Sequence, residues 1–247
     1  SCIPYPRYYW LNSHSLIDEK LFEVNMQTAQ HLQQLKPSYI RTILKAAAAE
    51  EVISLAGGLP ASSLFPLNLI KQAFHQLPQR DQLFQYGETT GYQPLVEFLR
   101  CQYELSADQR LIITSGSQQG LDLIARTFLN PGDGVAVEQC SYLGALQVFE
   151  LARANIVAVP QSENGPDLDA LKALFASGKI KLFYAVPDFH NPTGAVWSLK
   201  TRQQIAELCR SYQIGLIEDA PYRELRFSGQ QLPMLSTFYP EGTLVLR

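Results

Sequence analysis

The stretch KLFYAVPDFHNPTG, residues 181–194, decides the fold class of this chain. It opens with a short apolar run, Leu182 to Val186, which is typical of a strand buried on both faces. Apolar residues then recur at helical spacing between Ile205 and Tyr212, and another apolar run follows at Leu216 to Glu218. A strand, a helix and a second strand in this order predict a parallel sheet with a crossover helix.

The same alternation continues on both sides of this unit. It predicts six strands: Leu111 to Thr114, Val135 to Glu138, Ile156 to Val159, Leu182 to Val186, Leu216 to Glu218 and Leu244 to Leu246. We expect covering helices at Leu121 to Phe128 and Ile205 to Tyr212, with Ser198 as N-cap of the second helix and Gly215 as the left-handed residue after it. The predicted fold is therefore α/β, with a three-layer, mostly parallel sheet and crossover helices.

The chain before residue 111 has a different character. Amphipathic helices are expected at Leu67 to Leu77 and Pro94 to Tyr103, and a polar loop joins them at Phe84 to Gly91. A further helical pattern runs from Gln27 to Ala49 with a break at Pro37. We therefore divide the chain into three parts: an N-terminal extension of unknown role at 1–25, a segment for a small domain and dimer contacts at 26–80, and a large domain at 81–247.

Composition narrows the class of protein. The 247 residues carry 20 Lys and Arg against 23 Asp and Glu, and this balance argues against a nucleic-acid binder. The four cysteines are widely separated and the four histidines have no metal-binding spacing, so neither a disulfide scaffold nor a metal site is expected. No apolar run approaches the length of a membrane span, and we expect a cytoplasmic protein.

Ligands of open α/β sheets bind beyond the carboxyl ends of the strands. After the first predicted strand, small residues from Thr114 to Gly120 enter a helix, where backbone N–H groups and hydroxyls suit a phosphate. The alternative is an ordinary helix N-cap with a tight turn, for which Ser is a favoured residue. Tyr142 follows the second strand, where its ring can stack on a planar ligand or simply pack.

Two further strand ends carry polar side chains. Asn191 can point its amide at a ligand oxygen, although a plain Asn-Pro turn is the alternative. Asp219 ends a buried apolar strand, so it needs a partner. A protonated ring nitrogen would serve, with Tyr222 reaching another side of the ring; the alternative is a structural salt bridge to Arg223 or Arg226.

Together these residues describe a site for pyridoxal phosphate, and from about Met26 to Arg247 the sequence resembles the fold-type I aminotransferases of class I and II. It looks most similar to the aminoadipate/kynurenine aminotransferase group in these segments: LAGGLP at 55–60, FP at 65–66, QYG at 85–87, GY at 91–92, EDAPY at 218–222 and ELRF at 224–227. The resemblance implies transfer of an amino group between an amino acid and a 2-oxo acid.

The resemblance also implies roles for single residues. Its cofactor-binding positions correspond here to Gly116, Ser117 and Gln118 at the phosphate, Tyr142 on the ring face, Asn191 and Tyr222 at the phenolic oxygen, and Asp219 at the ring nitrogen. Tyr86 corresponds to a residue that reaches the phosphate of the neighbouring subunit, and Gly58 to a backbone position against the substrate. Both imply a homodimer with shared active sites.

The family's Schiff-base Lys follows the strand that reads Thr243 to Arg247 here, so the resemblance places it beyond this sequence, and no catalytic residue is assigned. An antiparallel strand that lies between Leu111–Thr114 and Leu244–Leu246 in the family comes later still. We therefore expect a portion of a longer protein that is incomplete at its C-terminus and inactive alone.

Two other functions fit the same resemblance. A C–S lyase would keep the cofactor and change the reaction, because the fold does not fix the chemistry. An aminotransferase-like effector domain of a transcription regulator would need a DNA-binding domain upstream, and residues 1–25 are too short and not basic.

Overall fold

The computed structural model describes residues 27–32 and 58–247. The chain forms two compact units, 1–52 and 53–247. In the first unit the described residues include one 3-10 turn, η2 (Gln30–Leu32). The predicted extension at 1–25 and all but the start of the predicted helix at 27–49 lie outside the described residues.

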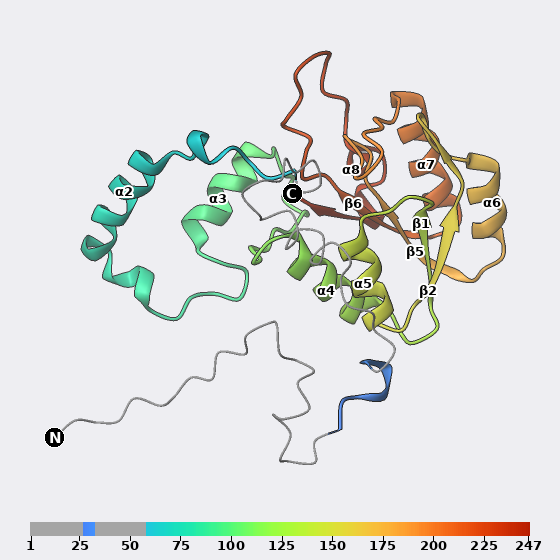
Figure 1. The fold of residues 1–247 in the computed structure, drawn as a ribbon, viewed down its shortest axis with the longest axis horizontal. Helices are drawn as coiled ribbons and strands as arrows, with labels where there is room; N and C mark the ends of the chain where they lie inside the picture. Colours follow the sequence, from blue (N-terminus) through green and yellow to red (C-terminus); the bar gives the residue numbers. More distant parts are fainter. Residues whose placement is uncertain (1–26, 33–57) are drawn as a thin grey trace, which may run out of the picture. The chain divides into compact units, whose positions relative to one another are not determined.

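The second unit is built on a five-stranded parallel sheet (Figure 1). Its strands, in the spatial order β2-β1-β5-β6-β7, are Asn155–Val159, Gly134–Glu138, Ile180–Ala185, Gly215–Asp219 and Thr243–Leu246. Five of the six predicted strands are thereby confirmed, each within two residues at its ends. All five carboxyl ends consequently meet at one edge of the sheet.

Helices cover both faces of this sheet, because the strand residues alternate between two apolar clusters. One cluster joins the sheet to α4 (Ser117–Phe128) and α5 (Leu143–Leu151). The other joins it to α6 (Leu168–Ala176), α7 (Leu199–Ser211) and the short α8 (Leu235–Phe238). Figure 1 shows α4 and α5 on one side of the strands and α6 and α7 on the other. The predicted three-layer arrangement is confirmed.

The remaining elements are short or precede the sheet. They are η3 (Ser62–Leu64), α2 (Leu67–Gln76), η4 (Leu77–Gln79), η5 (Asp81–Phe84), α3 (Gln93–Gln102), the hairpin of β3 (Gln161–Ser162) and β4 (Gly165–Pro166), and η6 (Pro240–Gly242). Helices α2 and α3 confirm the two amphipathic patterns. None of the helices in 27–32 and 58–247 has the length and apolar character to cross a membrane.

The two residues predicted to bound α7 have different outcomes. Ser198 is the N-cap, and its Oγ accepts a hydrogen bond from the Thr201 N–H at 3.1 Å. The prediction for Gly215 is wrong, because Gln213 takes the left-handed conformation (φ 55°) while Gly215 opens β6. A Cβ at Gly215 would lie 2.6 Å from Leu182 Cδ2, so a larger residue there would require the Leu182 side chain to move.

The predicted strand at Leu111–Thr114 is not a strand in the structure. Its Ile113 N–H donates to the Thr90 carbonyl at 2.9 Å, and Ile112 is exposed. An apolar run forms a strand only where a neighbouring backbone supplies hydrogen-bond partners. Among the described residues, no strand lies between this segment and β7.

Gly134→Ala should destabilise the chain by about 1–3 kcal/mol, the usual cost of overpacking. A Cβ at this position would lie 2.2 Å from the Lys179 carbonyl oxygen, which belongs to the backbone and cannot rotate away. Urea unfolding measures the loss. Gly87→Ala is the control, because a Cβ at Gly87 meets no atom within 4 Å. Equal unfolding midpoints for the two variants would contradict the close packing of β1 on β5.

Candidate functional site

The predicted phosphate segment forms the N-terminus of α4. Gly116 precedes the helix with φ 86°, and no side chain caps the first turn. The cap is thus Gly116 in a tight turn and not a serine, because Ser117 is the first helical residue. The first N–H groups of a helix have no partners within it, and the helix dipole adds positive potential. This end of α4 is suited to an anion.

A hydrogen bond ties this helix end to the first turn of α5, next to Tyr142. Gln118 Nε2 donates to the Gly144 carbonyl at 3.0 Å, and Tyr142 is the half-buried residue just before α5. Burial raises the pKa of Tyr142, and the nearby Tyr222 and Asp219 raise it further. Asp219 at the end of β6 and Tyr222 just after it therefore both lie near enough to Tyr142 to affect its pKa.

Asp219 ends β6 and is 3% exposed. Its Oδ2 accepts a hydrogen bond from the Tyr184 hydroxyl at 2.7 Å, whereas its buried Oδ1 has no hydrogen-bond partner. Burial raises the pKa of Asp219, and the hydrogen bond from Tyr184 lowers it in part. The alternative of a salt bridge to Arg223 or Arg226 is wrong, because both arginines pair with another carboxylate.

Asn191 and Tyr222 come together from the ends of β5 and β6. Asn191 Nδ2 donates to the Tyr222 hydroxyl at 3.4 Å, which is a long and therefore weak hydrogen bond. Both side chains are half-buried, and the Asn191–Pro192 peptide bond is cis. The loop is thus more than a plain Asn-Pro turn, because it brings the amide of Asn191 to the phenol predicted to share its ligand.

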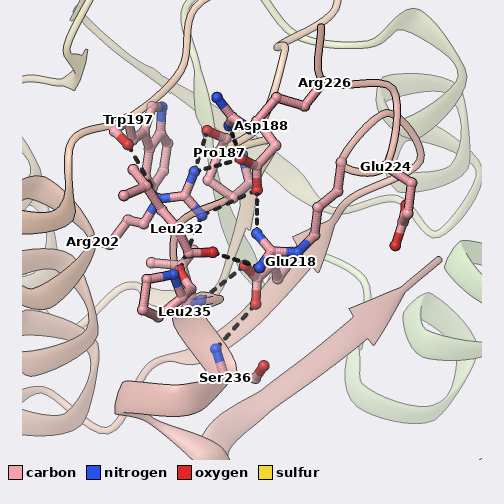
Figure 2. A network of polar contacts seen from close by, with 12 residues as sticks. Pro187, Asp188, Trp197, Arg202, Glu218, Glu224, Arg226, Leu232, Leu235 and Ser236 are labelled. Atoms are coloured by element: carbon pink, nitrogen blue, oxygen red, sulfur yellow. Dashed lines mark hydrogen bonds and ion pairs between the residues drawn. The ribbon is translucent and has the colours of Figure 1, made fainter. Parts of the chain in front are cut away.

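Asp188 carries an ion-pair network that sequence reasoning missed (Figure 2). Its fully buried carboxylate accepts hydrogen bonds from Arg202 at 2.8 and 3.1 Å and from Arg223 at 3.0 Å, and Arg226 lies 3.4 Å away. Arg202 also donates to the Pro187 carbonyl at 2.9 Å. The sequence signal was a charged residue directly after a buried apolar run, which needs a partner wherever it lies.

Glu138 anchors a second polar cluster missed from the sequence. Its carboxylate accepts from the Val186 N–H and from Trp197 Nε1, each at 3.2 Å. His190 is buried against it, with Nε2 3.2 Å from Glu138 Oε2 but outside hydrogen-bond geometry. Thr193 Oγ1 lies 3.0 Å from His190 Nδ1. This cluster holds the loop that carries Asn191.

The described residues contain no group of three His, Cys, Asp or Glu side chains arranged for a metal ion.

Two predicted site residues stand apart from the others. Tyr86 is fully exposed in the loop before α3. Gly58 is exposed with φ 52°, and a Cβ there would meet no atom within 4 Å. The structure does not bring either residue against the other predicted site residues.

The arrangement fits a planar ligand of defined polarity. Asp219 Oδ1 offers a buried acceptor for a protonated ring nitrogen, Asn191 and Tyr222 flank a position for an oxygen substituent, and the open end of α4 suits a phosphate. Tyr142 supplies an aromatic face beside Asp219. The orphaned carboxylate oxygen is the strongest element of this fit, because a buried acceptor without a donor costs free energy.

Comparison with known proteins points in the same direction. The family described as "Aminotransferase class I and II" matches residues 50–244. Aromatic-amino-acid aminotransferase 1 of Thermococcus litoralis is 38% identical over 85% of this chain and 54% of its own length. The 2-aminoadipate transaminase of Thermus thermophilus is 36% identical over 82% and 51%. The chain thus spans about half the length of these curated relatives.

A solved structure is similar as well. The kynurenine aminotransferase of Pyrococcus horikoshii, in complex with PMP and with KYN as substrate and KYA as product, superposes with a TM-score of 0.83 at 35% identity. The match covers 92% of this chain and 59% of that one.

Asp219→Asn should remove a pH dependence of stability. Because burial raises the pKa of Asp219 in the folded chain, its contribution to stability is complete below the unfolded pKa and is lost as pH rises through the folded pKa. The free energy of unfolding of the variant, relative to wild type, should therefore rise by roughly 1–3 kcal/mol between acid and neutral pH.

Urea unfolding across that pH range measures this difference. Asp122→Asn is the control, since its carboxylate pairs with Arg126 at 2.9 Å on the surface of α4. A difference between Asp219→Asn and wild type that stays constant with pH would contradict a buried, desolvated carboxylate.

Proposed function

The chain belongs to the aminotransferases of class I and II, and on this premise we propose that it binds pyridoxal phosphate in an enzyme that moves an amino group between an amino acid and a 2-oxo acid. The observation that carries the proposal is Asp219 Oδ1, a buried carboxylate oxygen without a partner. It lies beside Tyr142, in a site whose other residues follow β5 and β6. The named activities of the relatives support the proposal.

Four residues would hold the ring. Asp219 would accept a hydrogen bond from the protonated ring nitrogen through Oδ1, and Tyr142 would lie against the ring face. Asn191 and Tyr222, already 3.4 Å apart, would donate to the phenolic oxygen. When bound, pyridoxal phosphate supplies an electron-accepting ring for reactions at the amino-acid Cα. These four residues orient the ring and keep its nitrogen protonated, and none is proposed as the nucleophile.

The phosphate would lie at the end of α4. The backbone N–H groups of Ser117 and Gln118, which follow the left-handed Gly116, would donate to its oxygens. The hydroxyl of Ser117 is also available, because it makes no capping hydrogen bond. We further propose that Gly58 lies against the substrate.

Two alternatives share the cofactor site and differ in reaction. A C–S lyase would release a sulfur leaving group, and an effector domain of a transcription regulator would bind ligand without turnover. The two curated relatives described above are both named for amino-group transfer, which favours an aminotransferase.

Pyridoxal phosphate should bind the protein with an affinity that depends on Asp219. We expect Asp219→Ala to weaken binding about tenfold or more, because a hydrogen bond between charged groups contributes roughly 1.5–3 kcal/mol. Titration calorimetry of the complete gene product measures the affinity. Asp169→Ala, at an exposed position in α6, is the control.

The same protein should convert amino acids to 2-oxo acids, measured by mass spectrometry with 2-oxoglutarate as acceptor. The panel should include aromatic amino acids, 2-aminoadipate and kynurenine, because the relatives carry these names. Release of a thiol from cysteine conjugates without oxo-acid formation would favour the lyase. Binding without either product would favour the effector domain.

We also propose a homodimer in which Tyr86 reaches the phosphate of the neighbouring subunit. The full exposure of Tyr86 supports this, because its ring is free to contact another chain. Tyr86→Phe should weaken pyridoxal phosphate binding about fivefold without changing the sedimentation coefficient, since only one hydrogen bond is lost. Tyr92→Phe, also at an exposed position, is the control. A gene product that sediments as a monomer at micromolar concentration would exclude the shared site.

A further inference from the structure

Tyr184 contacts the candidate site from within the core. It lies in β5, is 1% exposed and donates its hydroxyl to Asp219 Oδ2 at 2.7 Å. The sheet register places Tyr184 beside Ile217, two residues before Asp219. Residues two apart in a strand point to the same face, so the register directs both side chains to one side of the sheet.

Tyr184 is the one hydrogen-bond donor to Asp219 among the described residues. The nearby arginines do not replace it, because Arg223 and Arg226 are paired with Asp188. The orientation of the carboxylate therefore depends on a single phenol. With Oδ2 occupied by this hydroxyl, the oxygen left for a ligand is Oδ1.

The hydrogen bond from Tyr184 is important for the charge of Asp219 because of the groups around it. Besides Asp219, the charged or polar groups that raise the pKa of Tyr184 are Tyr142 from the start of α5 and Glu138 at the end of β1, and Tyr222 after β6 acts on Tyr142. None of them is a cation. A hydrogen bond donated to a carboxylate stabilises its charged form, and it does so more strongly in a buried setting than in water.

We propose that Tyr184 is a positioning residue that keeps Asp219 ionised and turns Oδ1 toward the ring nitrogen of pyridoxal phosphate. This inference rests on the proposed function. One proton would be shared between the ring nitrogen and Oδ1. Donation from Tyr184 to Oδ2 stabilises the carboxylate, so the proton stays on the nitrogen and the ring stays cationic. Without the hydroxyl, the proton would move toward Asp219 and the ring would become neutral.

The test compares wild type with Tyr184→Phe in the complete gene product, loaded with pyridoxal phosphate labelled with ¹⁵N in the ring. The ¹⁵N chemical shift reports directly whether the nitrogen is protonated. We expect a protonated signal in wild type at neutral pH and a shift toward the neutral-pyridine value in the variant. Affinity for pyridoxal phosphate should fall about tenfold, as for the loss of a hydrogen bond to a charged group.

The Phe variant keeps the ring that packs edge-on against Phe149 at 5.9 Å. Tyr212→Phe, in the core cluster on the opposite sheet face, controls for loss of a tyrosine hydroxyl and should leave both readouts unchanged. If Tyr184→Phe does not fold, 3-fluorotyrosine at position 184 gives the opposite test. Its more acidic hydroxyl should donate more strongly, make the carboxylate less basic and lower the pH at which the nitrogen–carboxylate pair loses its shared proton.

A wild-type ¹⁵N signal and affinity in Tyr184→Phe, or an unchanged titration with 3-fluorotyrosine, would overturn the inference and reduce Tyr184 to a packing residue. Failure of the proposed function is a different result. It would be seen as no binding of pyridoxal phosphate by wild type, or as a protonated ring nitrogen that persists in Asp219→Asn.

Discussion

The carboxylate of Asp188 is the constraint on which the candidate site depends. It follows β5 and binds Arg202 from α7 together with Arg223 and Arg226 from the turn after β6. Buried charges are stable only when they are paired and hydrogen-bonded, and breaking such a pair costs about 3–5 kcal/mol. Asp188 therefore fixes the two loops that carry Asn191 and Tyr222 relative to each other, although it contacts neither residue itself.

Strand alternation gives the two acidic residues that end β6 separate tasks. Glu218 points toward α8, where its carboxylate accepts the N–H groups of Leu235 and Ser236 at 2.8 and 3.0 Å (Figure 2). Asp219 points to the opposite face and meets Tyr184. Glu218 has each oxygen satisfied by the protein, whereas Asp219 keeps one oxygen free. The same strand thus supplies one structural carboxylate and one that suits a ligand.

Much of the sheet and of the candidate site could be predicted from the sequence, because buried parallel strands are continuous apolar runs and ligand-binding residues follow them. The strands around residues 134–138 and 215–219, and the grouping of Asn191, Asp219 and Tyr222, were accessible in this way. The hydrogen-bond partner of Asp219 could not be predicted in this way. Tyr184 is 35 positions away and looks like one more residue of an apolar strand. The prediction of a strand at Leu111–Thr114 was wrong because local sequence was not sufficient there. The composition of this segment suits a strand, but strand formation depends on a neighbouring backbone that local sequence does not specify.

The contact between Tyr142 and Gly144 has a consequence for the entropy of ligand binding. A Cβ at Gly144 would lie 2.5 Å from the phenol ring, so the ring occupies the space that any larger side chain would take. The ring is half-buried and the adjacent Gly144 carbonyl is held by Gln118, so part of the ring's rotational freedom is lost before any ligand arrives. Immobilising a side chain on binding costs roughly 0.5–1.5 kcal/mol. Here part of that cost is met during folding, and Gly144 contributes by leaving the space into which the ring packs.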